Sequence, residues 1–137
     1  MALRISADVP AGWSRTSAEE VTWIKTGQEK AGSLQMSYED VADGIEPIAA
    51  GVQLGRRAGW GTPLNLGEAE CEHGKLAFVS FFGGPFPDAR LWVVVSEDGS
   101  AVVFKWTGEE AVGDEAEVIV LRTLGLVARP PSVFFGG

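Results

Sequence analysis

Residues 77–95 read "AFVSFFGGPFPDARLWVVV" and are the most hydrophobic part of the chain, yet glycines and prolines interrupt their middle. A glycine loop that binds a phosphate normally lies between a strand and the N-terminus of a helix. Gly83-Gly84 lies instead between two runs typical of strands, and Pro85 and Pro87 lack the amide N–H that a phosphate would need. We therefore expect a strand-to-strand connection here, without a ligand.

The segment that follows predicts a β-hairpin. "RLWVVV" (90–95) and "AVVFKW" (101–106) flank "SEDGS", in which Asp98-Gly99 is a strong signal for a two-residue turn. Such a turn would set these pairs: Val95 with Val102, Val93 with Phe104, Leu91 with Trp106, Val94 with Val103, and Trp92 with Lys105. Both faces of these strands are apolar, as are those of "KLAFVSFF" (75–82), so we expect helices to cover the sheet on both sides.

The first half of the chain predicts strands followed by a helix. Alternation of apolar and polar residues indicates short strands at 3–9, 20–25 and 33–37. Apolar residues then recur near helical spacing, and Ser37-x-x-Asp40 is a variant of a helix-start capping arrangement. We therefore expect helix over most of 38–57.

Pro47 conflicts with one straight helix in that segment. Either Asp43-Gly44 breaks the helix and Pro47 lies in the first turn of a second one, or the helix kinks, so we expect an interruption near 44–47. The same segment holds glycines spaced by four, Gly51, Gly55 and Gly59. Close packing of one helical face, or a helix ending, explains them better than a ligand loop, because no known nucleotide-binding pattern fits.

A second helix is predicted within 108–127, which has an acidic start and an apolar stripe of Val118, Leu121, Leu124 and Leu126. Residues 128–137 form a tail, and 1–137 fits a single domain. The predicted fold is α+β: an antiparallel sheet of six to seven strands packed by two helical segments, similar to an α/β/α sandwich.

The charge balance narrows the classes of partner. The chain has 19 Asp and Glu against 11 Lys and Arg, a net charge of -8. That charge repels nucleic acid and anionic membranes, so neither is expected, whereas it attracts a basic protein or simply keeps the protein in solution. No signal-peptide pattern and no apolar run of membrane-spanning length occurs, so we expect a cytoplasmic protein; a leader already removed would leave the same sequence.

Few residues could support catalysis or hold a metal. Cys71 is the only cysteine and His73 the only histidine, which excludes an intrachain disulfide and a Cys-rich zinc module. The two share a strand face with backbones ~6.5 Å apart, which is far for direct activation of the thiol. We expect no catalytic residue, no cofactor and no metal.

The candidate partner-binding residues are acidic or aromatic. Glu68, Glu70 and Glu72 alternate with smaller residues and so share one strand face. Such a face is usually solvated; acid–base chemistry or a calcium ion is the alternative. We expect this strip, with Trp60 in a nearby loop, to contact a basic partner, although Trp60 could equally fill the core. Phe134 and Phe135 should dock on their own domain or on another molecule.

The order of elements resembles the PsbP/DcrB-like α/β/α sandwich superfamily over roughly residues 3–127. The closest local similarities are the Pro-x-Gly-Trp at 10–13 and "GKLAFVSFF" at 74–82, while Pro47 departs from the pattern. Members of this superfamily include photosystem extrinsic subunits, a nuclear-import cofactor, bacterial lipoproteins and chaperones of secreted Rhs-type toxins, and most are not enzymes. The resemblance implies a protein-binding module and transfers no functional residue to this chain.

Three functions follow as hypotheses. The leading one is a non-catalytic, bacterial, cytoplasmic protein-binding module, either an immunity-type inhibitor or a chaperone of a secreted toxin. The second is a structural or assembly subunit that forms a homodimer or larger homo-oligomer. The remote third is a small hydrolase that uses the glutamates.

Overall fold

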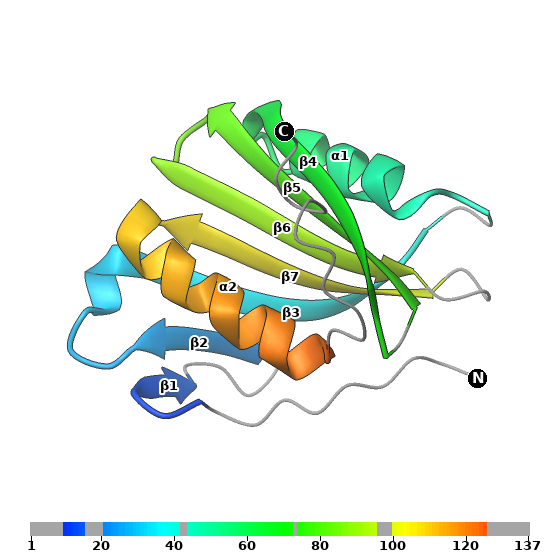
Figure 1. Cartoon of the computed structure of the whole chain (residues 1–137). Coiled ribbons are helices and arrows are strands. Elements are labelled where there is room, and N and C mark those ends of the chain that lie inside the picture. The colour runs from blue at the N-terminus through cyan, green and yellow to red at the C-terminus, as the bar shows by residue number, and fades with distance from the viewer. Residues whose placement is uncertain (1–9, 16–20, 42–43, 73, 96–99, 126–137) are drawn as a thin grey trace.

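The computed structural model describes residues 10–15, 21–41, 44–72, 74–95 and 100–125. These residues form one antiparallel sheet of seven strands in the order β1-β2-β3-β7-β6-β5-β4 (Figure 1). Its strands are β1 (Trp13–Arg15), β2 (Val21–Lys25), β3 (Gly32–Asp40), β4 (Gly61–Cys71), β5 (Gly74–Gly83), β6 (Asp88–Val95) and β7 (Ser100–Gly108). The helices are η1 (Glu29–Ala31, a 3-10 turn), α1 (Pro47–Arg57) and α2 (Glu110–Leu124). The predicted α+β fold is confirmed.

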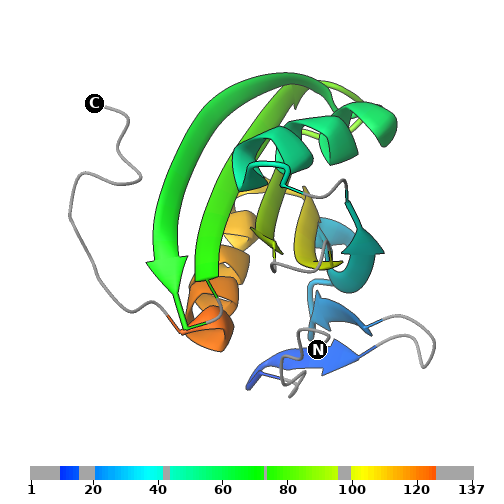
Figure 2. The same ribbon diagram turned by 90° about the vertical axis from the view of Figure 1, so that its right-hand side faces the viewer.

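The two α-helices pack on opposite faces of the sheet. Helix α1 contacts β4, β5 and β6, and α2 contacts β6 and β7. Figure 2 shows that β4 and β5 bend strongly, so that the sheet curves between the helices. The predicted α/β/α layering is therefore confirmed. Neither of these helices has the length and apolar character needed to cross a membrane.

Each face of the sheet carries its own apolar core. The core on the α2 side contains four tryptophans, Trp13, Trp23, Trp92 and Trp106, with Leu34, Phe104 and the apolar residues of α2. The core on the α1 side contains Leu54, Trp60, Val79, Phe81, Leu91, Val93 and Val103. Strands β6 and β7 contribute to both cores because successive side chains of a strand point to opposite faces.

The β6–β7 hairpin is confirmed, but its predicted register is wrong by one residue. Val95 lies opposite Ala101, Val93 opposite Val103, and Trp92 opposite Phe104. Paired residues such as Val95 and Ala101 have an odd number of residues between them. A two-residue turn at Asp98-Gly99 would leave an even number, so the structure excludes that turn. Residues 96–99 lie outside the described part of the chain. Since a slip of one residue exchanges faces, Trp92 and Phe104 share the α2 side rather than opposite sides.

The first helix begins later than predicted. Residues 37–40 belong to β3, where Ser37 pairs with Val103 and Asp40 with Ser100, so the capping interpretation of Ser37 and Asp40 is wrong. Pairing with β7 outweighs the local helical pattern. Pro47 is the first residue of α1, where its missing N–H is no loss. Of the two alternatives for this segment, a break followed by a new helix is therefore confirmed.

The glycines of α1 allow close packing, as predicted. A Cβ at Gly51 would lie 2.9 Å from a methyl carbon of Val79, and one at Gly55 would overlap the ring of Phe81. Gly59 lies beyond the end of the helix with a φ of 76°, a conformation that favours glycine. The predicted connection at Gly83-Gly84 is also confirmed, since it joins β5 to β6.

Helix α2 is confirmed, and its predicted apolar stripe is confirmed at Leu124, which is buried, and at Leu121, which packs against the core, but it is wrong at Val118. Val118 is 53% exposed, whereas the buried positions are Val112, Gly113, Ala116, Val120 and Leu124. The prediction followed the bulkiest side chains, but the helix approaches the sheet through its small ones: a Cβ at Gly113 would lie 2.7 Å from Nε1 of Trp106. Leu126 and the strand predicted at 3–9 lie outside the described residues.

Candidate functional site

Strand β4 forms an edge of the sheet, and several of its side chains face solvent. Within the described residues it pairs only with β5, and its register shifts between Pro63 and Asn65, an irregularity of the β-bulge kind. Leu64 and Leu66 are 59% and 48% exposed. An exposed edge with apolar side chains is a template for pairing with another chain.

The predicted acidic strip lies on the same strand. Glu68 and Glu70 are exposed, while Ala69 is half-buried and Cys71 is buried on the other face, as the period of two predicts. Glu72 follows the end of the strand. Its N–H donates to the Gly125 carbonyl at 2.9 Å, and its side chain packs against Gly125 at the end of α2.

Two of the three glutamates therefore stay together next to the exposed leucines, while Glu72 lies at the end of the helix. We call Leu64, Leu66, Glu68 and Glu70 the edge surface. Two further exposed aromatics, Phe82 at 51% and Phe86 at 40%, come from the end of β5 and from the connection that follows it.

Trp60 does not lie at the surface, and that expectation is wrong. Its side chain is 6% exposed and packs edge-on against Phe81, with ring centroids 5.7 Å apart. Because Gly55 carries no side chain, the ring of Phe81 lies close under α1, and the indole packs beside that ring in the same core. Of the two alternatives, the core-filling one holds, so Trp60 cannot offer its ring to a partner.

The remaining candidates give no site in the described part of the chain. Phe134, Phe135 and His73 lie outside the described residues. Cys71 is buried and forms no disulfide. Within the described ranges, no group of three or more His, Cys, Asp or Glu residues is placed to hold a metal ion.

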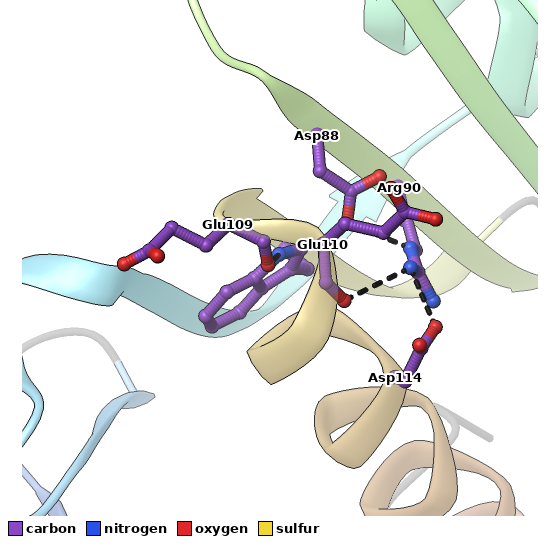
Figure 3. Close-up of polar contacts among 6 residues, drawn as sticks. Asp88, Arg90, Glu109, Glu110 and Asp114 are labelled. Carbon is purple, nitrogen blue, oxygen red and sulfur yellow. Dashed lines mark hydrogen bonds and ion pairs between the residues drawn. The ribbon is translucent and has the colours of Figure 1, made fainter.

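A buried arginine at the start of β6 is the centre of a site that the sequence interpretation missed. The Arg90 side chain is only 9% exposed. Its Nε donates to Oδ2 of Asp88 at 2.8 Å, and its Nη2 donates to Oδ1 of Asp114 at 2.8 Å and to the Glu110 carbonyl at 3.3 Å (Figure 3). The guanidinium thus joins strand β6 to the first turns of helix α2.

The start of α2 is held at a second point beside this arginine. Nε1 of Trp106 donates to the Glu109 carbonyl at 3.2 Å, and the Glu109 N–H donates to the Ala31 carbonyl at 2.7 Å. The helix N-terminus is therefore tied to β7 and η1 as well as to Arg90.

The carboxylates around Arg90 outnumber its single positive charge. Burial raises the pKa of Asp88 above its usual value, because the opposing attraction of Arg90 does not compensate fully. Burial also raises the pKa of Glu117, one turn beyond Asp114 on α2. The pKa of Arg90 rises despite its burial, since its hydrogen bond to Asp114 and the surrounding carboxylates favour the charged form. We call Asp88, Arg90, Asp114 and Glu117 the Arg90 cluster.

Ser80 lies next to the Arg90 cluster, and its side-chain hydroxyl has no hydrogen-bond partner among the described residues. It is directly opposite Arg90 in the β5–β6 pairing, so both side chains point to the α2 side of the sheet. The serine is 7% exposed, and its Oγ is buried without a partner. In the sequence the only hint is an arginine within the apolar run "DARLWVVV".

Comparisons with known proteins support the fold. No protein-family model and no curated protein matches the chain. Among solved structures, the chain is similar to cyanobacterial PsbP (CyanoP) from Synechocystis sp. PCC 6803, with a TM-score of 0.52 over 83% of this chain and 79% of that one. Sequence identity is 8%, so the likeness concerns the fold alone. The predicted resemblance is thereby confirmed at that level: the chain has a PsbP-like α/β/α fold.

Proposed function

We propose that this protein is a non-catalytic protein-binding module that binds a basic partner through the edge surface. One observation carries the proposal: the edge strand β4 exposes Leu64 and Leu66 directly beside the carboxylates of Glu68 and Glu70. Apolar side chains supply area to bury, and carboxylates supply attraction for basic side chains. The surface combines both along one strand.

Strand addition is the mode of binding that this surface favours. A partner segment in extended conformation would bond to the backbone groups on the outer side of β4, which pair with no other described strand. Its apolar side chains would cover the two leucines, and its lysines or arginines would lie near the two glutamates. Charge attraction of this kind mainly accelerates association, and most strongly at low ionic strength.

The biological role that we propose is that of a bacterial cytoplasmic immunity-type inhibitor or a chaperone of a secreted toxin. A net charge of -8 suits a partner of opposite charge. The resemblance to the PsbP/DcrB-like superfamily supports a binding role, since most of its members are not enzymes.

Affinity capture from a bacterial lysate tests the proposal. The baits are the wild type, the edge variant Glu68→Lys/Glu70→Lys, and a control with the same charge change elsewhere, Glu29→Lys/Glu46→Lys, at two other exposed positions. We expect one basic protein to be retained by the wild type and the control and lost from the edge variant. Equal retention by all three baits would refute the edge surface as the binding site.

The edge position of β4, which pairs only with β5 among the described strands, also favours the second candidate function, self-association. A second copy could pair along the same strand, β4 to β4, and form a continuous sheet. Light scattering after size-exclusion chromatography distinguishes the two. A monomer supports a foreign partner, whereas a dimer that the Glu68→Lys/Glu70→Lys variant alters supports the homo-oligomer.

A further inference from the structure

The Arg90 cluster carries more negative than positive charge in a place that is only partly open to water. Asp88 and Asp114 each bond to the arginine, and their side chains are 14% and 69% exposed. Glu117 is half-buried, and no described residue forms an ion pair or hydrogen bond with its carboxylate. With all carboxylates ionised, one guanidinium faces three of them. A further cation would therefore be stabilised here.

The unpaired hydroxyl of Ser80 is a second, independent observation. A buried polar atom without a partner is unfavourable, and most such atoms in folded proteins are paired. Ser80 shares its face with Arg90, so an N–H group placed between β5 and α2 could donate to its Oγ. Glu117 interacts electrostatically with Arg90, the residue opposite Ser80, so its carboxylate belongs to the same cluster.

We propose that Ser80 and the Arg90 cluster bind one cationic side chain, a lysine or an arginine, of the partner protein. This inference rests on the proposed function, because it names a contact of the same partner. An anion is disfavoured by the excess of carboxylates. A metal ion is disfavoured because Arg90 already occupies an oxygen of both Asp88 and Asp114.

Aromatic side chains near Ser80 could pack against the methylene groups of the bound lysine or arginine. Phe78 and Phe82 lie two residues before and after Ser80 on β5 and therefore on the same face. Phe82 is 51% exposed. The methylene groups of a lysine or arginine pack on aromatic rings, and the cation is attracted to the ring face.

The position of the site agrees with strand addition at β4. Ser80 pairs with Asn65, one strand in from the edge. Side chains of an added strand alternate between the two faces, so some would lie over the edge surface and others on the α2 side. Strands are spaced about 4.8 Å apart, so an added strand would run about 10 Å from β5. Only a long side chain reaches over β4 from there, which favours lysine and arginine.

A titration with small probes tests the site without the partner. The isotope-labelled full chain is titrated with Nα-acetyl-arginine amide and Nα-acetyl-lysine amide, with the uncharged Nα-acetyl-norleucine amide as the control probe. We expect saturable shifts of the amide signals around Ser80, Arg90 and Asp114 with at least one cationic probe, and none with norleucine. Absence of saturable shifts with both cationic probes, or equal shifts with norleucine, would overturn the proposal.

Two variants make the result specific. Glu117→Gln should weaken binding of the cationic probe by about fivefold or more, since losing one close charge pair costs at least that factor. Glu115→Gln is the matched control on the same helix; its carboxylate instead bonds Nζ of Lys25 at 2.6 Å. It should leave probe binding unchanged. Equal effects of both variants would also overturn the proposal.

Failure here is distinguishable from failure of the proposed function. If the probes do not bind but capture of the partner still depends on Glu68 and Glu70, only the cation site is refuted. If the probes bind at Ser80 but capture ignores the edge variant, only the edge surface is refuted. Dispersion of the amide spectrum confirms that each variant is folded.

Discussion

Two acidic regions of the molecule, the edge surface and the Arg90 cluster, show how surroundings decide what a carboxylate does. Glu68 and Glu70 project from an edge strand into solvent, where salt screens their charge. Asp88 on β6 and Glu117 on α2 are partly buried where the helix packs on the sheet, so water solvates their charges less. The first pair can attract a partner over a distance at little cost to the fold. The second pair affects the stability of the fold itself.

The largest expected effect comes from removing the cation of the buried region. Arg90→Met should lower the free energy of unfolding by about 3 kcal/mol, because it leaves the Asp88 carboxylate buried without its partner. Urea unfolding followed by tryptophan fluorescence measures the change. The exposed Arg57→Met is the control and should change stability by less than about 0.5 kcal/mol.

Removing the charge of Asp88 together with that of Arg90 tests whether the loss of stability is electrostatic. If the loss is due to unpaired carboxylates, Arg90→Met combined with Asp88→Asn should recover part of it. A double variant as unstable as the sum of its parts would mean that Arg90 stabilises by packing alone, and the contrast between the two regions would then not depend on charge.

A smaller effect of opposite sign is expected at Glu117. Its pKa is raised in the folded state, so the protonated form favours folding, and stability is lost as the pH rises from about 4.5 through the raised value. Glu117→Gln removes that loss and should stabilise the protein at pH 7 by about 1 kcal/mol or less, since the group is partly exposed.

Thermal unfolding across pH 4 to 8 checks both the sign and the window of this prediction. The variant and the wild type should converge as the pH falls to about 4, where the wild-type carboxyl is protonated too. A variant that is less stable than the wild type at pH 7 would show that Glu117 has a favourable partner.

The smallest effect on stability is expected at the edge surface. Glu68→Lys/Glu70→Lys should change the free energy of unfolding by only about 0.5 kcal/mol, part of it from placing a lysine opposite Lys75. Urea unfolding with and without added salt measures it. A loss comparable to that of Arg90→Met would mean that the edge is part of the folded core and not a free surface.

Much of the fold could be predicted from local patterns. The apolar runs around 77–95 predicted strands covered on both faces, and Pro47 predicted an interruption near 44–47, with a new helix beginning there as one of two alternatives. Such signals depend on residues only a few positions apart, so they survive without knowledge of the tertiary structure.

The candidate site could be predicted only in part. The alternation of Glu68 and Glu70 with smaller residues was sufficient to place both on one exposed face. Trp60 could not be assigned, because its burial depends on Phe81. That residue lies on β5, one strand and one hairpin connection further along the chain, and it packs beneath Gly55 of α1. The Arg90 cluster was missed because its members are spread over residues 88–117 and meet only when α2 packs on β6.

The sequence by itself determined the element types, the two-sided sheet and the acidic character, because hydrophobic period and composition act locally. The tertiary structure decided the register of β6 and β7, the extension of β3 through Asp40, and the face of α2 that is buried. Each of these depends on how well distant side chains fit together. The observed β6–β7 register, one residue away from the predicted one, places Trp92 and Phe104 on the same face of the sheet. Gly113 lets α2 approach Trp106 closely. Packing of that kind is a property of the assembled sheet and helices, and no short stretch of the sequence contains it.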